Sequence, residues 1–314
     1  MKLAAWVAGI AIALAALPWA IGGEYYVNLA SQIFIAAIFA MSLNLLVGYG
    51  GMTSLGHAAY LGVAAYATAW LMLRAGLGPL AAGGGALVIT TLMAAFYGVL
   101  ALRASGLSFL MITLALGQIL WGLAYRWVDV TGGDNGLSVL ARPSPGGIDL
   151  TGATAFYYFT LAVFAIAFAI ITLLVRSPFG ASLRATRDQA RRMSALGHNV
   201  WLVRWIAFVL AGFWGAVSGV LYVYYNNYIS PHSLSLTQSA EVLLMVIAGG
   251  PSTILGPVVG AVLVVLMKNV ASAYVEHWTL LLGVVFVVIV MFLPDGIVPG
   301  MKRLYQRSRR GSDR

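Results

Sequence analysis

The sequence predicts an all-α polytopic membrane protein with about ten transmembrane helices, of which one or two are broken or re-entrant. Hydrophobic residues make up 61% of the 314 positions, charged residues only 9%, and the mean hydropathy is +0.92. A soluble domain of this length could not bury so much apolar surface. The apolar residues form stretches of roughly 17 to 23 residues, which at about 1.5 Å per residue cross a bilayer core of roughly 30 Å. In lipid such stretches must be helices, because the backbone has no water to bond.

Ten candidate spans follow one another within a single membrane domain, residues 1–300. They are predicted at residues 3–21, 29–47, 57–73, 80–102, 107–125, 154–175, 205–225, 240–249, 256–274 and 278–298. The first follows Lys2 and resembles a secretory signal, but we expect an uncleaved helix, because no soluble domain follows that would need export. The eighth holds about 10 residues, too few to cross the core unaided, and is expected to be a half-helix or a re-entrant segment. Most of the 36 glycines lie inside these runs, where they allow neighbouring helices to approach closely.

Orientation is predicted from the arginines, since Lys and Arg in short loops favour the cytoplasm. The loop 176–204 contains six arginines against one acid, and the tail 301–314 contains six basic residues against one acid. Both are expected to be cytoplasmic, and counting spans back from them places the N-terminus and the C-terminus on that side. The loop 126–153 is then outside. It carries the acids Asp129, Asp134 and Asp149.

Two glycine-rich segments interrupt apolar runs and resemble each other: residues 50–56 read GGMTSLG and residues 249–256 read GGPSTILG. Broken helices at membrane depth are tolerated only inside protein or beside a water-filled cavity, so polar residues near the breaks are candidates to line a path for a polar solute. The candidates at the breaks are Gly50, Gly51, Thr53, Ser54, His57, Gly249, Gly250, Ser252 and Thr253. Isolated polar residues inside spans join this set, namely Asn44, Gln118 and Glu241. Helix packing and local hydrogen bonding are the alternative for each residue.

The arginine-rich loop reads as a short helix. Thr186 and Gln189 fit a capping box, and Gly197 suits a helix stop. Apolar residues among the arginines would suit a helix that contacts a cytoplasmic partner. An amphipathic helix lying on anionic headgroups fits the spacing equally well.

The outer loop contains Thr131, Gly132, Gly133, Asp134 and Asn135, a composition that favours tight turns with polar groups exposed. This segment is a candidate docking site for another protein, or an ordinary turn.

Enzymatic and nucleic-acid functions find little support. The chain has no Walker-type phosphate loop, no paired histidines at metal-ligand spacing and no nucleophile elbow, and it contains no cysteine. The net charge of +9 is carried between and after apolar spans, where it sets orientation rather than nucleic-acid binding. We therefore expect no metal site and no cofactor on this chain, a lipid environment, and no nucleic-acid partner.

Several motifs in order along the chain carry a family resemblance. Residues 43–57 read LNLLVGYGGMTSLGH, residues 131–136 read TGGDNG, and SPFG at residues 177–180 leads into RATRD at residues 184–188. Further matches follow at residues 195–197, 207–208, 229–231, 239–250 and 255–257. From about residue 40 to residue 298 the chain resembles the permease family of branched-chain amino acid ABC importers.

The resemblance implies a type II-like ABC importer permease in a bacterial inner membrane. Its expected partners are a homologous second permease, two cytoplasmic ABC ATPases that carry ATP and Mg, and a periplasmic substrate-binding protein. Branched-chain amino acids, or a related solute such as urea, an amide or an aromatic acid, would be imported. The loop would be the coupling helix, with contacts from Arg184, Arg187, Asp188, Arg191, Met193, Leu196 and Gly197. Ala190 and Ser194 stand where family members often carry an acid.

A self-sufficient secondary transporter or channel is the rival interpretation, and a membrane-embedded enzyme is a third. The scarcity of buried carboxylates suited to ion coupling argues against the first rival.

Overall fold

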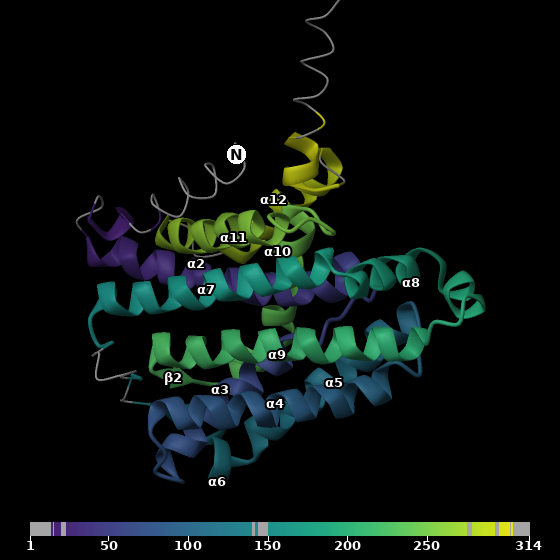
Figure 1. The fold of residues 1–314 in the computed structure, drawn as a ribbon. Coiled ribbons are helices and arrows are strands. Elements are labelled where there is room, and N and C mark those ends of the chain that lie inside the picture. The colour runs from purple at the N-terminus through teal and green to yellow at the C-terminus, as the bar shows by residue number, and fades with distance from the viewer. Residues whose placement is uncertain are drawn as a thin grey trace, which may run out of the picture.

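The computed structural model describes residues 14, 16–19, 23–139, 142–143, 150–274, 278–292, 295–301 and 303. These residues form a bundle whose long helices run side by side across the view in Figure 1. Most of the predicted first span, Asp149 and the basic tail beyond residue 303 lie outside the described residues.

The regular secondary structure of the described chain is helical, apart from one short pair of strands. Its helices are α2 (Glu24–Asn44), the π-helical turn η1 (Leu45–Tyr49), α3 (Ala58–Leu73), α4 (Pro79–Ala101), α5 (Leu107–Arg126), α6 (Val128–Thr131), η2 (Gly133–Asn135), α7 (Ala153–Arg176), α8 (Pro178–Ala195), α9 (Val200–Asn226), η4 (Pro231–Leu234), α10 (Leu236–Gly249), α11 (Gly256–Tyr274) and α12 (Trp278–Phe292). The strands β1 (Leu137–Ser138) and β2 (Tyr228–Ile229) pair antiparallel, with Leu137 opposite Ile229.

Eight of the described helices have the composition of membrane segments. Five are long and apolar enough to cross a bilayer, and they are Glu24–Tyr49, Pro79–Ala101, Leu107–Arg126, Ala153–Arg176 and Val200–Asn226. Three shorter apolar helices are Ala58–Leu73, Leu236–Gly249 and Gly256–Ala271. The prediction of an all-α polytopic membrane protein is therefore confirmed for the described residues. The number of ten spans stays a prediction.

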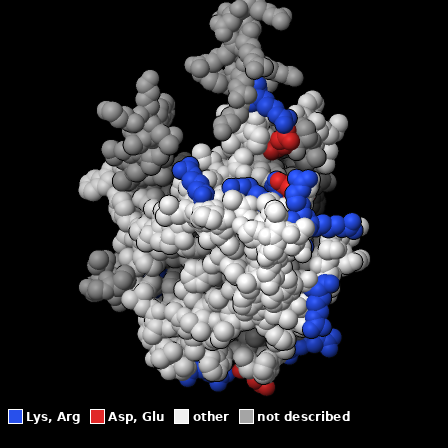
Figure 2. Space-filling model, turned by 45° about the vertical axis from the view of Figure 1, so that its right-hand side comes forward, with Lys and Arg blue, Asp and Glu red and all other residues white. Residues whose placement is uncertain are grey.

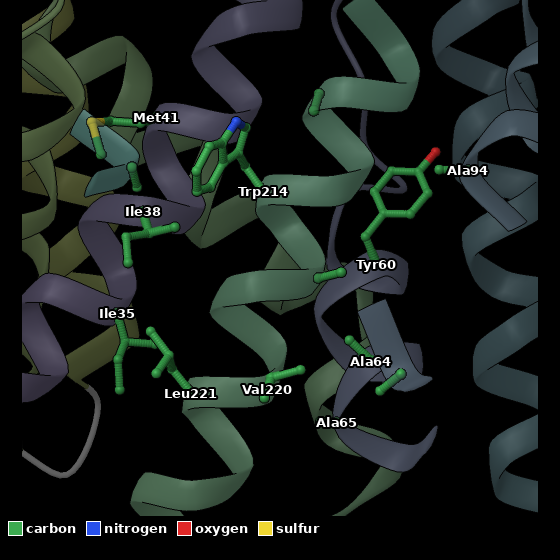
Figure 3. Close-up of a cluster of buried hydrophobic side chains, with 14 of the residues drawn as sticks. Ile35, Ile38, Met41, Tyr60, Ala64, Ala65, Ala94, Trp214, Val220 and Leu221 are labelled. Atoms are coloured by element: carbon green, nitrogen blue, oxygen red, sulfur yellow. The ribbon is translucent and has the colours of Figure 1, made fainter. Parts of the chain in front are cut away.

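The centre of the bundle is α9, which passes between α2 on one side and α3 on the other (Figure 3). Trp214 and Leu221 of α9 lie near Ile35 and Ile38 of α2, and all four belong to the main apolar core or its packing shell. Small residues permit the close approach, since a Cβ added to Gly219 of α9 would overlap the backbone of α3. Gly219 thus acts as the predicted close-packing contact, whereas Gly84 and Gly122 lie in apolar helices with open space beside them.

The outward faces of α4 and α7 consist of large apolar side chains, such as Leu92, Phe96, Ile166 and Leu173. Exposed apolar surface on this scale would aggregate in water, whereas lipid solvates it. Figure 2 shows a mostly uncharged surface, with Lys and Arg residues in its upper part and along its right-hand edge, and a smaller group of basic and acidic residues at its lower edge.

The first glycine segment makes a true break. Residues 50–57 are not helical and run into the bundle, so that α3 begins among buried residues. Gly56 packs so closely on α5 that a Cβ there would overlap the Thr113 carbonyl, and the Ser239 hydroxyl of α10 accepts a hydrogen bond from the Ala58 N–H at 3.0 Å. Protein encloses this irregular backbone, which satisfies the condition that a bilayer imposes.

Two helices, α9 and α10, begin earlier in the chain than predicted, because a capping residue precedes each of them. The seventh span was predicted from residue 205, but α9 begins at Val200, because the Asn199 side chain accepts a hydrogen bond from the Leu202 N–H at 3.0 Å. The eighth segment begins at Leu236, where Ser235 caps α10. At 14 residues, α10 is roughly 21 Å long and shorter than the bilayer core, so the prediction of a short segment is confirmed.

Candidate functional site

The two ends of the bundle differ in charge. The end that contains α8 carries Arg103, Arg176, Arg184, Arg187, Arg191, Arg192 and Arg204, with Asp188 beside them. The opposite end, where β1 and β2 lie, carries Arg74, Arg126 and Arg142 with Glu24, Asp129 and Asp134. Among the described residues the α8 end is thus strongly positive and the other end is balanced. That asymmetry agrees with the predicted cytoplasmic position of α8.

The predicted capping box in α8 is wrong. The helix begins earlier, after Ser177, whose hydroxyl accepts the N–H of Gly180 at 3.4 Å, and proline occupies its first position. Thr186 is therefore not an N-cap but lies buried within the helix. Gln189 has non-helical backbone angles (φ −149°, ψ 78°) and divides α8 into two parts.

The predicted helix stop at Gly197 is confirmed. Gly197 has φ +86°, and the His198 N–H donates to the Met193 carbonyl at 3.1 Å, which is a Schellman end. The second part of α8 lies at the right-hand tip of the molecule in Figure 1. Its side chains Arg191 and Leu196 are exposed, Leu196 by 70%, whereas Met193 is buried.

Through Arg187, the first part of α8 is bonded to η1, which precedes the first glycine segment, and to the second glycine segment. Its Nη1 donates to the Gly48 carbonyl and, at 2.7 Å, to the Ser252 hydroxyl, while Nε pairs with Asp188 at 2.9 Å. The stem of Arg187 crosses Gly51, where any Cβ would overlap it. Arg184 instead caps the neighbouring helix, since its Nη1 donates to the Val175 carbonyl at 2.8 Å.

The second glycine segment is also bonded to the end of α2 and to η1. The Asn44 side chain accepts from the Ser252 N–H at 3.2 Å and donates to the Thr253 carbonyl at 2.9 Å. The Ser252 hydroxyl donates to the Gly48 carbonyl at 2.6 Å, and a Cβ at Gly48 would overlap Asn44 and the Ser252 backbone. We call Asn44, Gly48, Arg187, Ser252 and Thr253 the arginine junction. It joins predicted coupling residues to predicted path residues, which the sequence had placed in separate groups.

The remaining glycines of these segments serve close packing. Gly249 lies against Gly256 at the start of α11, and Gly250, at φ +113°, lies against Pro299. Gly50 packs on the Leu46 carbonyl of η1.

His57 and its neighbours lie in the core rather than at the junction. His57 is fully buried, its Nε2 lies 2.7 Å from the Ser42 hydroxyl, and its ring stacks on Phe39. Ser54 is buried and Thr53 is half-buried. For His57, the alternative of local packing and hydrogen bonding accounts for its contacts.

Glu241 forms an ion pair between helices. Both carboxylate oxygens lie 3.2 Å from Nζ of Lys268 in α11. One residue further along α11, the Asn269 side chain donates to Gln32 of α2 at 3.2 Å. These four side chains thus form two polar contacts between largely apolar helices.

Gln118 is an exposed polar side chain in the middle of α5. It lies on the same face as Met111, which is 68% exposed, and Gly122, whose added Cβ would meet nothing. No hydrogen bond to Gln118 exists within the described part of the chain. An amide that faces lipid would have no hydrogen-bond partner. We therefore expect a polar neighbour at this face of α5.

The predicted outer loop forms a hydrogen-bonded turn. Three glycines with positive φ, Gly132, Gly133 and Gly136, shape it, and the buried Thr131 hydroxyl donates to the Ala124 carbonyl at 2.6 Å. The adjoining Asp134 and Asn135 are exposed, and the Asn135 carbonyl accepts from Tyr228 at 3.0 Å.

Comparison with known proteins gives consistent matches. The model of a family described as the permease component of branched-chain amino acid transport systems matches residues 25–292. The high-affinity branched-chain amino acid transport system permease protein LivM of Escherichia coli K12 is 27% identical over 300 residues, which is 87% of this chain and 70% of that protein. LivM of Salmonella typhimurium LT2 is 25% identical over 301 residues, with the same coverage. The permease protein LivH of E. coli K12 is 24% identical over 136 residues, 42% of this chain and 44% of that protein. No solved structure matches.

Proposed function

The chain belongs to the permease component family of branched-chain amino acid transport systems, and from this premise we propose that it is one membrane-spanning half of an ATP-driven importer. It carries branched-chain amino acids, or a related small solute such as urea, an amide or an aromatic acid, into the cytoplasm of a bacterium. The chain forms part of the path and binds no nucleotide. ATP and Mg belong to two separate ATPase subunits on the α8 side of the membrane.

The observation that carries this proposal is the double attachment of α8. Its tip exposes Leu196 and Arg191 beyond the bundle, where a cytoplasmic ATPase can reach them. Its first part is bonded through Arg187 to η1, which precedes the first glycine segment, and to Ser252 in the second glycine segment. A coupling element needs both properties, because the partner must act on a surface whose movement changes the contacts of the path.

A second, homologous permease is the proposed partner within the membrane. LivM and LivH of E. coli are both named as permeases of a branched-chain amino acid system, and both are similar to this chain. The α5 face around Gln118 supports such a neighbour, since the outward faces of α4 and α7 are mainly apolar. An amide of the second permease, or water between the two subunits, would supply the hydrogen bonds that lipid lacks.

The outer loop is the proposed contact for a periplasmic substrate-binding protein. Its glycines hold Asp134 and Asn135 in a fixed, exposed position at the end opposite α8. A preformed loop binds with less loss of conformational entropy than a mobile one.

Purification and reconstitution test the proposal. After mild detergent extraction from native cells, we expect a second permease and two ABC-type ATPases to co-purify with the chain. In vesicles that enclose ATP on the α8 side, the complex with its binding protein should accumulate labelled leucine, isoleucine or valine. A complex with catalytically inactive ATPases is the control. Recovery of the chain alone in several mild detergents, or uptake that persists without ATP, would identify a self-sufficient transporter or channel instead.

A further inference from the structure

Ser252 holds a backbone conformation that serine rarely adopts. Its φ is +64°, in the left-handed region where a Cβ crowds the backbone. The other described non-glycine residue with positive φ is Asn227, which ends α9, a position where asparagine is common. Ser252 is therefore the unusual residue, and strain of this kind persists only where surrounding contacts hold it.

The contacts that hold Ser252 all belong to the arginine junction. Its N–H donates to Asn44 of α2, its hydroxyl donates to the Gly48 carbonyl of η1, and the same hydroxyl accepts from Arg187 of α8. The strained residue is thus bonded to elements that lie about 65 and more than 200 positions away in the chain.

The Gly48 carbonyl is the shared acceptor of this arrangement. It lies in η1, which ends the α2 segment with π-helical hydrogen bonds. Carbonyls at a helix end have no partner within the helix and attract cations, so the Arg187 guanidinium provides both a donor and a counter-charge there. Single π-helical turns are frequent where helices change shape in function.

Arg187 is also placed so that a movement of α8 can withdraw it. Its side chain is 33% exposed, and its other partner, Asp188, is adjacent to it on the same helix. Water can replace the lost partners of an exposed guanidinium at small cost. Ser252, in contrast, would lose one of the bonds that hold its strained backbone.

We propose that Arg187 is a positioning residue that keeps Ser252 in its strained form, and that displacement of α8 by the ATPases releases it. Release lets Ser252 leave the left-handed region and separates η1 from the start of α11. The junction therefore has a bonded state, which the structure describes, and a released state. This inference rests on the proposed function, because it assigns the step by which α8 acts on the path.

Two substitutions at Ser252 separate this mechanism from a loss of packing. Ser252→Ala keeps the strain and removes the hydroxyl bonds, so the bonded state becomes unfavourable. Ser252→Gly removes the same hydroxyl but accepts positive φ without strain, so the bonded state survives. A strain typical of a left-handed residue corresponds to roughly a fivefold or larger change in the ratio of the two states.

The experiment uses the complete complex in vesicles and measures solute imported per ATP hydrolysed, together with ATP hydrolysis in the absence of solute. We expect Ser252→Ala and Arg187→Ala to lower import per ATP by about fivefold or more and to raise hydrolysis without solute. Ser252→Gly should retain most of the coupling. Arg103→Ala is the matched control, since Arg103 is an exposed arginine at the same end with no side-chain hydrogen bond or ion pair within the described chain.

The outcomes are distinguishable from failure of the proposed function. If the unmodified complex neither imports solute nor hydrolyses ATP, the importer proposal fails. If the unmodified complex couples normally and Ser252→Ala matches it, or if Ser252→Gly is as uncoupled as Ser252→Ala, the strained junction is not the coupling step. The Ser252 pair decides the question even where Arg187→Ala does not assemble with the ATPases.

Discussion

The Glu241–Lys268 pair allows a quantitative test of how the bundle tolerates charge in lipid. The two residues project from α10 and α11, helices that present mainly apolar side chains to each other and to α2, apart from the Asn269–Gln32 contact. The Glu241 side chain is 7% exposed and the Lys268 side chain 35%. The carboxylate is therefore largely removed from solvent and the ammonium group partly so, and each is stabilised by the other.

The expected loss of stability depends on which charged group remains after each substitution. Glu241→Leu removes the carboxylate partner of the Lys268 ammonium group; a charge costs about 2.5 to 3.5 kcal/mol at a helix centre and less on a side chain that can reach the interface, so we expect about 2 kcal/mol. Lys268→Met leaves a carboxylate in the more buried position and is expected to cost about 3 kcal/mol. Replacement of both by apolar residues of similar size removes the whole desolvation cost and should be nearly neutral. The double-mutant cycle should then give a coupling energy of about 5 kcal/mol, the sum of the two single costs.

The assay is the unfolding free energy of the purified complex in detergent, followed by tryptophan fluorescence for the parent chain, both single variants and the double variant. The Gln32–Asn269 contact provides a matched neutral pair, whose removal should change stability by only about 0.6 kcal/mol. If the double variant loses as much stability as the two single variants together, Glu241 and Lys268 do not stabilise the bundle as a pair and the reasoning is wrong.

Three further predictions concern other helices. Gly219→Val should prevent close packing of α9 on α3 and abolish recovery of folded protein, measured by size-exclusion chromatography, whereas Gly84→Val, where a Cβ meets open space, should be recovered normally. Gln118→Leu should leave the chain inserted but reduce co-purification of the second permease; unchanged co-purification would show that this face does not contact it. Gly197→Ala should destabilise the end of α8 by about 1 kcal/mol, because Ala disfavours positive φ. The same variant should lower the salt concentration at which the ATPases dissociate. Unaltered dissociation would show that the tip of α8 does not contact the ATPases.

Most of the helical architecture could be predicted from hydropathy, because lipid leaves an apolar run of sufficient length no alternative to a helix. The glycine pair at residues 50 and 51 also predicted a break that exists. Boundaries were less predictable where a cap acts locally: Asn199 starts α9 before the arginine that had marked the predicted boundary. The capping box failed for a related reason, since Ser177 and the following proline had already begun α8.

The contacts of the candidate site could not be predicted because they join residues that are distant in sequence. The sequence indicated Arg187 and Ser252 separately, but their hydrogen bond depends on how α8 packs against the turn between α10 and α11. The role of Gly48 was missed, although it stands among the glycines of the same motif. Positive φ at Ser252 leaves no signal in a single sequence, because serine is not a residue type that marks that conformation.

Most of the predicted path residues already bond to other residues of the protein, which limits the positions at which a solute can bind to this chain. Asn44, Ser252 and Thr253 use their polar groups within the arginine junction, and Glu241 uses its carboxylate on Lys268. A solute that bonded to any of them would first have to break an existing contact. Gln118 differs, because its amide is exposed on a membrane-spanning face. Within the described chain, we therefore expect a polar solute to contact the outer face of α5 more readily than the inside of the bundle. The residues around the glycine segments are better placed to change the shape of the bundle than to bind the solute.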